Sequence, residues 1–341
     1  MTFTPLVGHL WLNDRNDDVR FWYEAMTHSN NPAVPVCLLC GSVDVSIRDS
    51  LSAGDLLAGW SQDGHHFPTN SVQTLVREGM IHLYECRKCG FQFFNPKLAG
   101  GAEFYEHLHA GGPGYYAPNR PEAERNARFS VEHGYHSILD VGCWVGFALD
   151  NAKRAGLKTY GVELSRTAAA AAAERGHTIF PVLLENLAPE WEGKFDLISL
   201  NQVLEHVPDP VGLVGQCVRF LSPQGAIAIA VPSATGVLRF NPWLPANWPP
   251  HHISRWTIKD FHTLAEATHL RVLDTGGNQL LGSELQDNLL QHRRYFRTLQ
   301  KPYRGLPPFL IKCLGFIYRK TGMKYIFTSQ GHSIYCYLGR R

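Results

Sequence analysis

Short apolar segments alternate with helix-favouring segments through the second half of the chain. Five β-rich apolar runs lie there, at 137–141, 158–163, 178–182, 195–200 and 226–231. Helical stretches are predicted between the early runs, at 147–155, 166–175 and 210–221. Alternation of this kind is typical of right-handed crossover connections, and it predicts an α/β fold with a parallel, doubly wound sheet.

The pattern changes towards the C-terminus. A further helix is predicted from Thr257, because Thr257 and Asp260 have the spacing of a capping box. Two late strands are predicted at 271–275 and 333–338, and the residues between them are mostly helical in character. We therefore expect residues 276–332 to form a helical insertion before the last strand.

The whole chain divides into four predicted parts. Residues 1–34 form an N-terminal extension, and residues 35–98 hold two cysteine pairs on either side of a polar loop. A linker rich in Gly, Tyr and Pro is predicted at 99–121. Residues 122–341 then form the domain that contains the predicted sheet.

Composition and charge restrict the class of protein. The chain has 341 residues, of which 44% are apolar and 18% charged, as in ordinary globular proteins. A formal net charge of +2 requires neither a nucleic acid nor an anionic membrane as partner. No apolar run approaches the roughly 20 residues that span a bilayer, and the N-terminus lacks the basic region of a signal peptide. These features predict a cytoplasmic protein without a transmembrane segment.

Four of the eight cysteines form two CxxCG motifs, Cys37/Cys40 and Cys86/Cys89. The two-residue spacer lets both thiolates of a pair face one tetrahedral ion, and the following glycine permits the tight turn. Two such motifs predict a structural Zn²⁺ site with four thiolate ligands in a small zinc-ribbon-like module. The 45 residues between Cys40 and Cys86 are more than a usual ribbon loop contains, and His65 and His66 within them are alternative ligands.

The predicted first strand of the sheet runs into a glycine-bearing turn. Asp140 precedes this turn, Gly142 and Gly146 lie within it, and Glu163 ends the next strand, 21 residues beyond Gly142. Such a turn brings the backbone close to a ligand at the strand's carboxyl edge, and the second acid suits the hydroxyls of a ribose. A nicotinamide nucleotide would also fit, but its G-x-G-x-x-G spacing is absent, and Asp140 suits a cationic amino acid group.

From Asp140 onward, the chain resembles the class I S-adenosylmethionine-dependent methyltransferases, in particular the small-molecule branch with ubiquinone-pathway and sugar methyltransferases. The N-terminal motif CRKCGFQFFNP also resembles zinc modules that precede certain sugar methyltransferases. The resemblance implies a Rossmann-like sheet of seven strands whose last strand is antiparallel. The matching segments are ILDVGCWVG, GVELS, KFDLISLNQVLEHVPDP, AIAIAVPS, PPHHISRWT and GHSIYCYLGRR.

The resemblance also implies roles for particular residues in binding S-adenosyl-L-methionine. The glycine turn with Asp140 would shape the methionine pocket, and Glu163 would hold the ribose. Asn201 and Gln202 would lie near the sulfonium. The residues implied in cofactor binding are Asp140, Gly142, Gly146, Glu163, Glu185, Asn186, Asn201 and Gln202.

The chain departs from this family pattern at two places. Trp144 occupies the position of the middle glycine in the turn, so the turn must accommodate a large ring. Ubiquinone-pathway relatives carry an E-x-x-E-H metal cluster, which here begins with Gln202 and ends with Glu205 and His206. The loss of one carboxylate argues against a catalytic divalent metal at this cluster.

Three histidines are candidate general bases. His206 follows the fourth strand, and His251 and His252 lie in a loop rich in Pro and Trp. Imidazoles titrate near neutrality, so any of the three could accept a proton from the methyl acceptor. Each could instead serve only to fix its loop, and the tryptophans of the loop could either stack on an acceptor or pack for rigidity.

The most favoured function is methyl transfer to a small-molecule acceptor, with a hydroxyl or carbon of a sugar, nucleotide sugar or glycan as the preferred class. A nucleic-acid methyltransferase is an alternative, but no basic cluster surrounds the cysteines. A non-catalytic binding protein is another, because Trp144 could weaken cofactor binding. One amphipathic stretch, at 308–320, would suit packing on its own domain, which we favour, or peripheral contact with a membrane. The sequence is silent on oligomeric state.

Overall fold

The computed structural model describes residues 35–110, 120–281 and 325–341, together with isolated positions between 289 and 313. Residues Val36–Arg341 form one compact unit. Within the described residues, the strands form a sheet of seven and a sheet of four. No helix in this part of the chain is both long and apolar enough to span a membrane.

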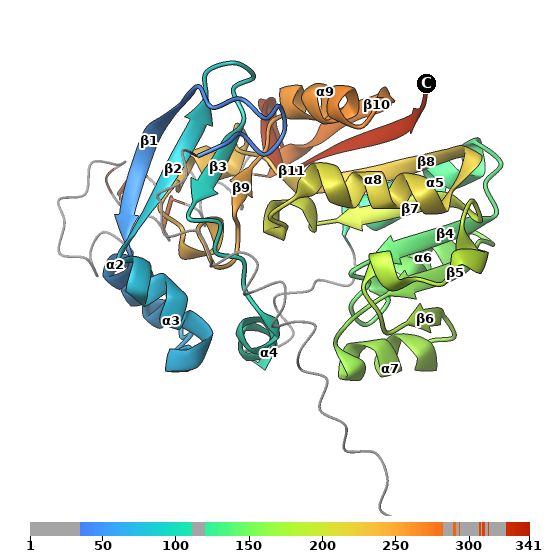
Figure 1. Cartoon of the computed structure of the whole chain (residues 1–341), viewed down its shortest axis with the longest axis horizontal. Coiled ribbons are helices and arrows are strands. Elements are labelled where there is room, and N and C mark those ends of the chain that lie inside the picture. Colours follow the sequence, from blue (N-terminus) through green and yellow to red (C-terminus); the bar gives the residue numbers. More distant parts are fainter. Residues whose placement is uncertain are drawn as a thin grey trace, which may run out of the picture. The chain divides into compact units, whose positions relative to one another are not determined.

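The seven-stranded sheet has the order β10-β11-β8-β7-β4-β5-β6 (Figure 1). Strands β4 to β8 pair in parallel, whereas β11 is antiparallel to both β8 and β10. The predicted seven-stranded sheet with an antiparallel last strand is therefore confirmed. Its strands are β4 (Ser137–Val141), β5 (Lys158–Val162), β6 (Thr178–Phe180), β7 (Phe195–Asn201), β8 (Leu221–Pro232), β10 (Leu270–Leu281) and β11 (Tyr325–Arg340).

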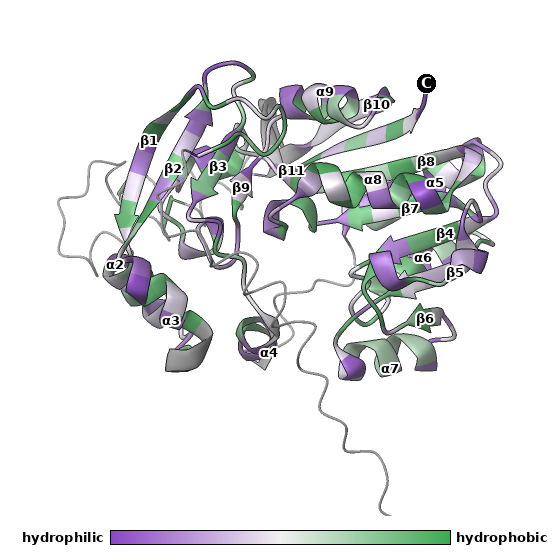
Figure 2. Cartoon of the chain, viewed as in Figure 1, coloured by the Kyte–Doolittle hydropathy of each residue, from purple (hydrophilic) through white to green (hydrophobic). Residues whose placement is uncertain are grey.

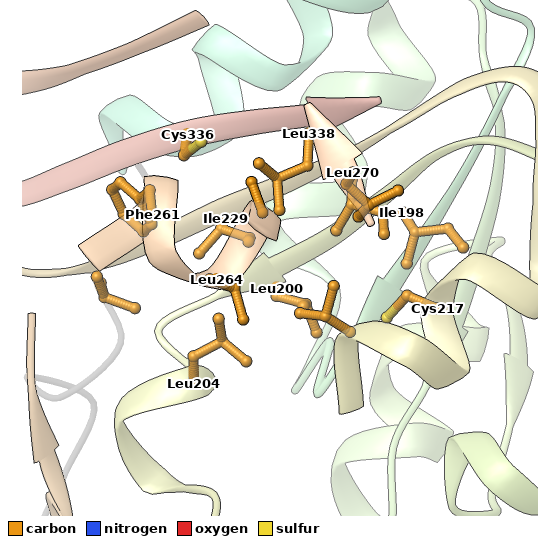
Figure 3. Packing of buried hydrophobic residues seen from close by; sticks show 14 of the residues in the cluster. Ile198, Leu200, Leu204, Cys217, Ile229, Phe261, Leu264, Leu270, Cys336 and Leu338 are labelled. Carbon is orange, nitrogen blue, oxygen red and sulfur yellow. The ribbon is translucent and has the colours of Figure 1, made fainter. Parts of the chain in front are cut away.

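Helices cover both faces of this sheet because its central strands are apolar on both sides. On one face, Ile138 and Leu197 pack with Phe129 and Leu149 of the helices α5 and α6. On the other face, Ile198 and Leu200 of β7 pack with Cys217 of α8 and Leu264 of α9 (Figure 3). These helices are α5 (Pro121–Glu132), α6 (Phe147–Arg154), α7 (Arg166–Glu174), α8 (Pro210–Phe220) and α9 (Ile258–Ala267).

Local sequence explains where several helices begin. The side chain of Asp209 accepts a hydrogen bond from the backbone of Gly212, and this bond caps α8 ahead of its first residue, Pro210. The capping box predicted at Thr257 and Asp260 is present at the start of α9. Figure 2 shows both hydrophobic and hydrophilic residues on α8, as expected for a helix with one face on the sheet.

The last two strands are longer than predicted. Strand β10 continues to Leu281, and β11 already begins at Tyr325. The two pair over almost their whole length, with irregularities in register near Gly277 and Gln279. The two ends of the predicted helical insertion are therefore strands. Their pairing satisfies the backbone hydrogen bonds of both segments, and the local sequence did not predict this pairing. The rest of the insertion and most of 308–320 lie outside the described residues.

The four-stranded sheet, of order β1-β2-β3-β9, carries the cysteine motifs. Helices α2 and α3 lie between its first two strands and account for the long separation of the cysteine pairs. Its last strand, β9, comes from the loop that contains the histidine pair, and Phe91 packs edge-on to Trp256 at 4.9 Å between ring centroids. The elements are β1 (Val45–Ser52), α2 (Ala53–Gln62), α3 (Thr69–Glu78), β2 (Met80–Cys86), β3 (Gln92–Asn95), α4 (Ala102–Ala110) and β9 (Ser254–Arg255).

Candidate active site

The strand order reverses direction between β4 and β7. Ligands of doubly wound sheets bind outside the carboxyl ends of the strands at such a switch point. Asp140 lies at this place on β4, and it is buried, with 3% of its surface exposed. Ser199 and Asn201 of β7 donate hydrogen bonds of 2.6 and 3.1 Å to its carboxylate. The residues expected near the methionine and the sulfonium, Asp140 and Asn201, are thus in direct contact.

A buried polar chain continues behind Asp140 towards α5. Asn126 of α5 donates to the side-chain oxygen of Asn201 at 3.3 Å, and Tyr337 of β11 donates to Asn126 at 2.8 Å. Sequence reasoning missed Asn126, Tyr337 and Ser199, because nothing in the pattern distinguishes a buried Asn on a helix from an exposed one. Burial raises the pKa of Asp140 to about 6, although the hydrogen bonds from Ser199 and Asn201 oppose the rise.

The turn after β4 has three residues in the left-handed backbone region. Gly142, Trp144 and Gly146 have φ angles of 72°, 51° and 85°. Trp144 therefore adopts the conformation that a glycine would adopt at this position, at a cost of roughly 1–2 kcal/mol for a residue with a Cβ. Its backbone N–H donates to Glu163 at 2.9 Å, so the turn is tied to the carboxyl end of β5.

Glu163 is held firmly at that end of β5. One carboxylate oxygen accepts the N–H of Trp144, and the other accepts the N–H of Ser165 at 2.8 Å. A carboxylate oxygen has capacity for more than one hydrogen bond, so ribose hydroxyls can still bind to it. Fixing the carboxylate in this way orients it before a ligand arrives.

Gly146 permits a close approach between two layers of the fold. A Cβ at this position would lie 2.7 Å from Cδ2 of His177, so no larger side chain fits without a shift. The buried His177 in turn bonds to Thr159 at 2.8 Å and lies 3.1 Å from Asp150 of α6. The glycine is therefore needed for packing as well as for its backbone angle.

The other expected cofactor residues lie at the same edge of the sheet or beside it. Glu185 and Asn186 form a 3₁₀ turn (Leu184–Asn186) after β6, where Gln216 of α8 donates to Glu185 at 3.3 Å. Gln202 directly follows β7 with a φ of 57°, and its side chain lies 3.5 Å from Ser333 of β11. None of these positions contradicts the expected role.

The three candidate histidines form one cluster, which the sequence could not show. His206 follows β7 in a 3₁₀ turn (Leu204–His206), and His251 and His252 come from the loop before β9. The ring centroid of His206 lies 4.7 Å from that of His251 and 4.9 Å from that of His252. Burial lowers the pKa of His206 to about 4 and that of His252 well below its usual value, so both rings are neutral at pH 7.

Glu205 adjoins this cluster and is 1% exposed. In the described part of the chain, neither carboxylate oxygen of Glu205 has a hydrogen-bond partner, and one lies 3.6 Å from Nε2 of His206. Burial raises the pKa of Glu205 to about 8. Tyr105 of α4, which sequence reasoning did not single out, places its hydroxyl 3.2 Å from Nδ1 of His206.

Aromatic residues surround the histidines on one side. Trp248 and Trp256 are fully buried, and Nε1 of Trp248 donates to the backbone oxygen of Pro242 at 2.8 Å. Their burial favours the packing role over stacking on an acceptor. Trp60 of α2 contacts His251 edge-on at 6.1 Å between centroids, so the cysteine-containing region reaches the histidine loop.

The four cysteines of the two motifs converge. The sulfur of Cys37 lies 3.6 Å from that of Cys89, and Cys40 and Cys86 are equally close. A tetrahedral zinc ion with Zn–S bonds of about 2.3 Å would separate its ligands by about 3.8 Å, so the spacing fits such an ion. The glycines that follow the motifs have φ angles of 69° and 89°, as the tight turns require. His65 and His66 do not belong to the cluster.

The sheet order, the glycine turn and the acids at the ends of β4 and β5 define the class I methyltransferase fold, whose cofactor is S-adenosylmethionine. Comparison with known proteins agrees. A family model for the methyltransferase domain matches residues 109–275. A ubiquinone biosynthesis O-methyltransferase from Idiomarina loihiensis is 30% identical over 185 residues, 48% of this chain and 74% of that protein. The chain belongs to this family of S-adenosylmethionine-dependent methyltransferases.

Other relatives match over a shorter region. The ubiquinone biosynthesis O-methyltransferase of Methylococcus capsulatus is 35% identical over 95 residues, 26% of this chain, and the match spans 40% of that protein's length.

Among solved structures, the 1,6-didemethyltoxoflavin-N1-methyltransferase of Burkholderia thailandensis is 15% identical with a TM-score of 0.45. That alignment covers 70% of this chain and 86% of the solved one.

Proposed function

We propose that this chain transfers a methyl group from S-adenosylmethionine to a hydroxyl of a small molecule, with a histidine of the cluster as general base. The observation that carries the proposal is the cluster of His206, His251 and His252, in which burial lowers the pKa of His206 and His252. It lies beyond the carboxyl end of the strand that contributes Asn201, which is bonded to Asp140. Methyl transfer is an in-line displacement at a carbon that the sulfonium already activates, so alignment and proton removal are the tasks left to the protein.

The cofactor would lie over the switch point between β4 and β7. Asp140 would face the amino group of the methionine portion, and Glu163 would bind the ribose. Gly142 and Gly146 would let the backbone approach the cofactor, while Glu185 and Asn186 would flank the adenine. Asn201 and Gln202 would border the sulfonium.

His206 is the best placed base of the three. Its Nδ1 lies 2.6 Å from the backbone oxygen of His251, and a carbonyl oxygen can only accept a hydrogen bond. Nδ1 therefore carries the proton, and the lone pair of the neutral ring is on Nε2. His251 and His252 would support this ring or replace it in the role.

The acceptor is proposed to be a sugar, nucleotide sugar or glycan, with a hydroxyl as the favoured methylation site and a carbon as the alternative. The names of the relatives favour oxygen, and the cysteine-containing region beside the histidine loop resembles modules of sugar methyltransferases. The four cysteines would hold a structural Zn²⁺ in that region, at 35–98, ahead of a catalytic domain at 122–341. The relatives' connection with ubiquinone makes quinone precursors the second class of acceptor to test.

A transfer assay tests the proposed base. Release of S-adenosylhomocysteine would be measured with a panel of nucleotide sugars, glycans and quinone precursors. We expect His206→Gln to lower kcat by 10²–10⁴-fold while the affinity for S-adenosylhomocysteine stays within about threefold. His262→Ala, which changes an exposed histidine outside the cluster, is the matched control. Unchanged turnover in His206→Gln would refute the role of His206, and absence of turnover with the whole panel would refute the proposed acceptors.

A further inference from the structure

We propose that Arg255 is a positioning residue that keeps the proton of His206 on Nδ1, acting through the loop of residues 242–252. The path between the two residues runs through the side chain and backbone of Trp248 and then through the backbone oxygen of His251. The catalytic value of this arrangement rests on the proposed function, in which His206 is the general base. The position of the proton does not, because it is a property of the folded chain.

The guanidinium of Arg255 lies over two aromatic rings. Its Cζ is 5.3 Å from the ring centroid of Phe94 and 5.4 Å from that of Trp248. Phe94 belongs to β3 of the four-stranded sheet, and its ring centroid lies 4.8 Å from that of Trp248. Burial lowers the pKa of Arg255 to about 10, so the group stays charged at pH 7. The attraction between this cation and the ring faces is strong because water is largely excluded.

The backbone oxygen of Pro242 joins Arg255 to Trp248. It accepts a hydrogen bond of 2.8 Å from the guanidinium of Arg255 and another of 2.8 Å from Nε1 of Trp248. A carbonyl oxygen has two lone pairs, so both bonds form at the same time. The fully buried indole of Trp248 is therefore held at its N–H by the carbonyl and at its face by the cation.

The backbone of Trp248 passes this position on to the histidines. Its oxygen accepts the N–H of His251 at 3.1 Å and the N–H of His252 at 3.2 Å. The resulting turn directs the backbone oxygen of His251 towards Nδ1 of His206, at 2.6 Å. A shift of Trp248 would therefore move the oxygen that His206 contacts.

The tautomer of His206 depends on this oxygen. A carbonyl can only accept a hydrogen bond, so it keeps the proton of the neutral ring on Nδ1 and the lone pair on Nε2. The hydroxyl of Tyr105 lies 3.2 Å from the same nitrogen, but it imposes no such choice, because a hydroxyl can donate as well as accept. If the carbonyl of His251 moved away, Tyr105 could donate to Nδ1. The proton of the ring would then lie on Nε2, where it would prevent uptake of a proton from the acceptor.

Nuclear magnetic resonance of the imidazole nitrogens tests the proposal. The full-length protein would be labelled with ¹⁵N-histidine and measured at pH 7, and the signals of His206 would be identified by their absence in His206→Gln. We expect the unsubstituted protein to hold His206 in the Nδ1–H form. Arg255→Met, which removes the charge and the donor but keeps an apolar stem, should raise the population of the Nε2–H form by about tenfold or more.

Three other variants make the result specific. Trp248→Phe keeps an aromatic ring but loses the Nε1 donor, and it should cause the same change of tautomer. Arg255→Lys keeps the charge without the planar guanidinium, so its effect should lie between those of the unsubstituted protein and Arg255→Met. Arg239→Met is the matched control, because Arg239 is an exposed arginine that also lies over a ring, that of Phe240, and it should leave His206 unchanged.

The proposal is overturned if folded Arg255→Met keeps His206 in the Nδ1–H form, or if the unsubstituted protein already holds the Nε2–H form. Cooperative thermal unfolding shows which variants are folded. Should Arg255→Met fail this criterion, an unchanged tautomer in Trp248→Phe overturns the proposal instead. Because the tautomer is measured without turnover, the result is independent of the proposed methyl transfer. An unchanged kcat in a variant with a changed tautomer would refute His206 as the base but not its positioning by Arg255.

Discussion

Replacing Asp140 by Asn should remove a pH-dependent loss of stability. Burial raises the pKa of Asp140 to about 6, compared with about 3.9 in an unfolded chain. The native state therefore holds this proton more tightly than the unfolded state does, so the stabilisation is complete below pH 3.9 and is lost as the pH rises through 6. A shift of about two units corresponds to a total loss of about 3 kcal/mol, and about half of this loss falls between pH 5 and pH 8.

Urea unfolding at pH 5, 6, 7 and 8 would measure this effect. The free energy of unfolding of the unsubstituted protein should fall relative to that of Asp140→Asn by about half of this total over the range, because the amide does not titrate. Glu174→Gln, a change at an exposed carboxylate, should leave the pH dependence unaltered. Parallel curves for Asp140→Asn and the unsubstituted protein would show that the buried carboxyl is not perturbed in this way.

Three further predictions concern the glycine turn and the thiolate site. Gly146→Ala should destabilise the protein by roughly 2–3 kcal/mol, because a Cβ would lie 2.7 Å from His177. Gly156→Ala should cost only roughly 1 kcal/mol, because Gly156 also has a positive φ, of 89°, but no atom lies within 4 Å of the added Cβ. Equal melting temperatures of these two variants would contradict the packing argument. Trp144→Gly should change the free energy of unfolding by less than about 1 kcal/mol, since relief of the left-handed backbone strain offsets the greater entropy of the unfolded chain. In calorimetry, its affinity for S-adenosylhomocysteine should be within threefold of that of the unsubstituted protein. A tenfold loss would show that the indole itself binds the cofactor. Cys89→Ser should lower the zinc content by one ion per chain and reduce the melting temperature, and an unchanged zinc content would exclude a four-thiolate site.

Much of the fold was predictable from local sequence. The strands β4 to β8 are short apolar runs separated by helices, and this pattern depends only on neighbouring residues. The glycine turn with Gly142 and Gly146 was also predictable, and so was the acid Glu163. Glycines in a tight turn and an acid at the end of the next strand occur at a fixed spacing in the sequence. The structure brings these residues to one edge of the sheet, as the parallel topology requires.

Contacts between distant segments were not predictable. Strand β9 is only two residues long and joins the sheet of the cysteine region, although it lies about 160 residues after β3. The buried position of Asn126 depends on Tyr337 at the other end of the chain. The convergence of His206 with His251 and His252 likewise depends on tertiary structure, so the sequence could offer three separate candidates but no cluster.

Calorimetric titration with S-adenosylhomocysteine tests the central claim most directly. The zinc-replete protein should bind it with a micromolar dissociation constant, and Glu163→Ala should abolish this binding because the ribose loses its carboxylate partner. NAD, the control for a dinucleotide-binding fold, should not bind. Failure of the unsubstituted protein to bind S-adenosylhomocysteine, or undiminished binding by Glu163→Ala, would contradict the proposed cofactor site.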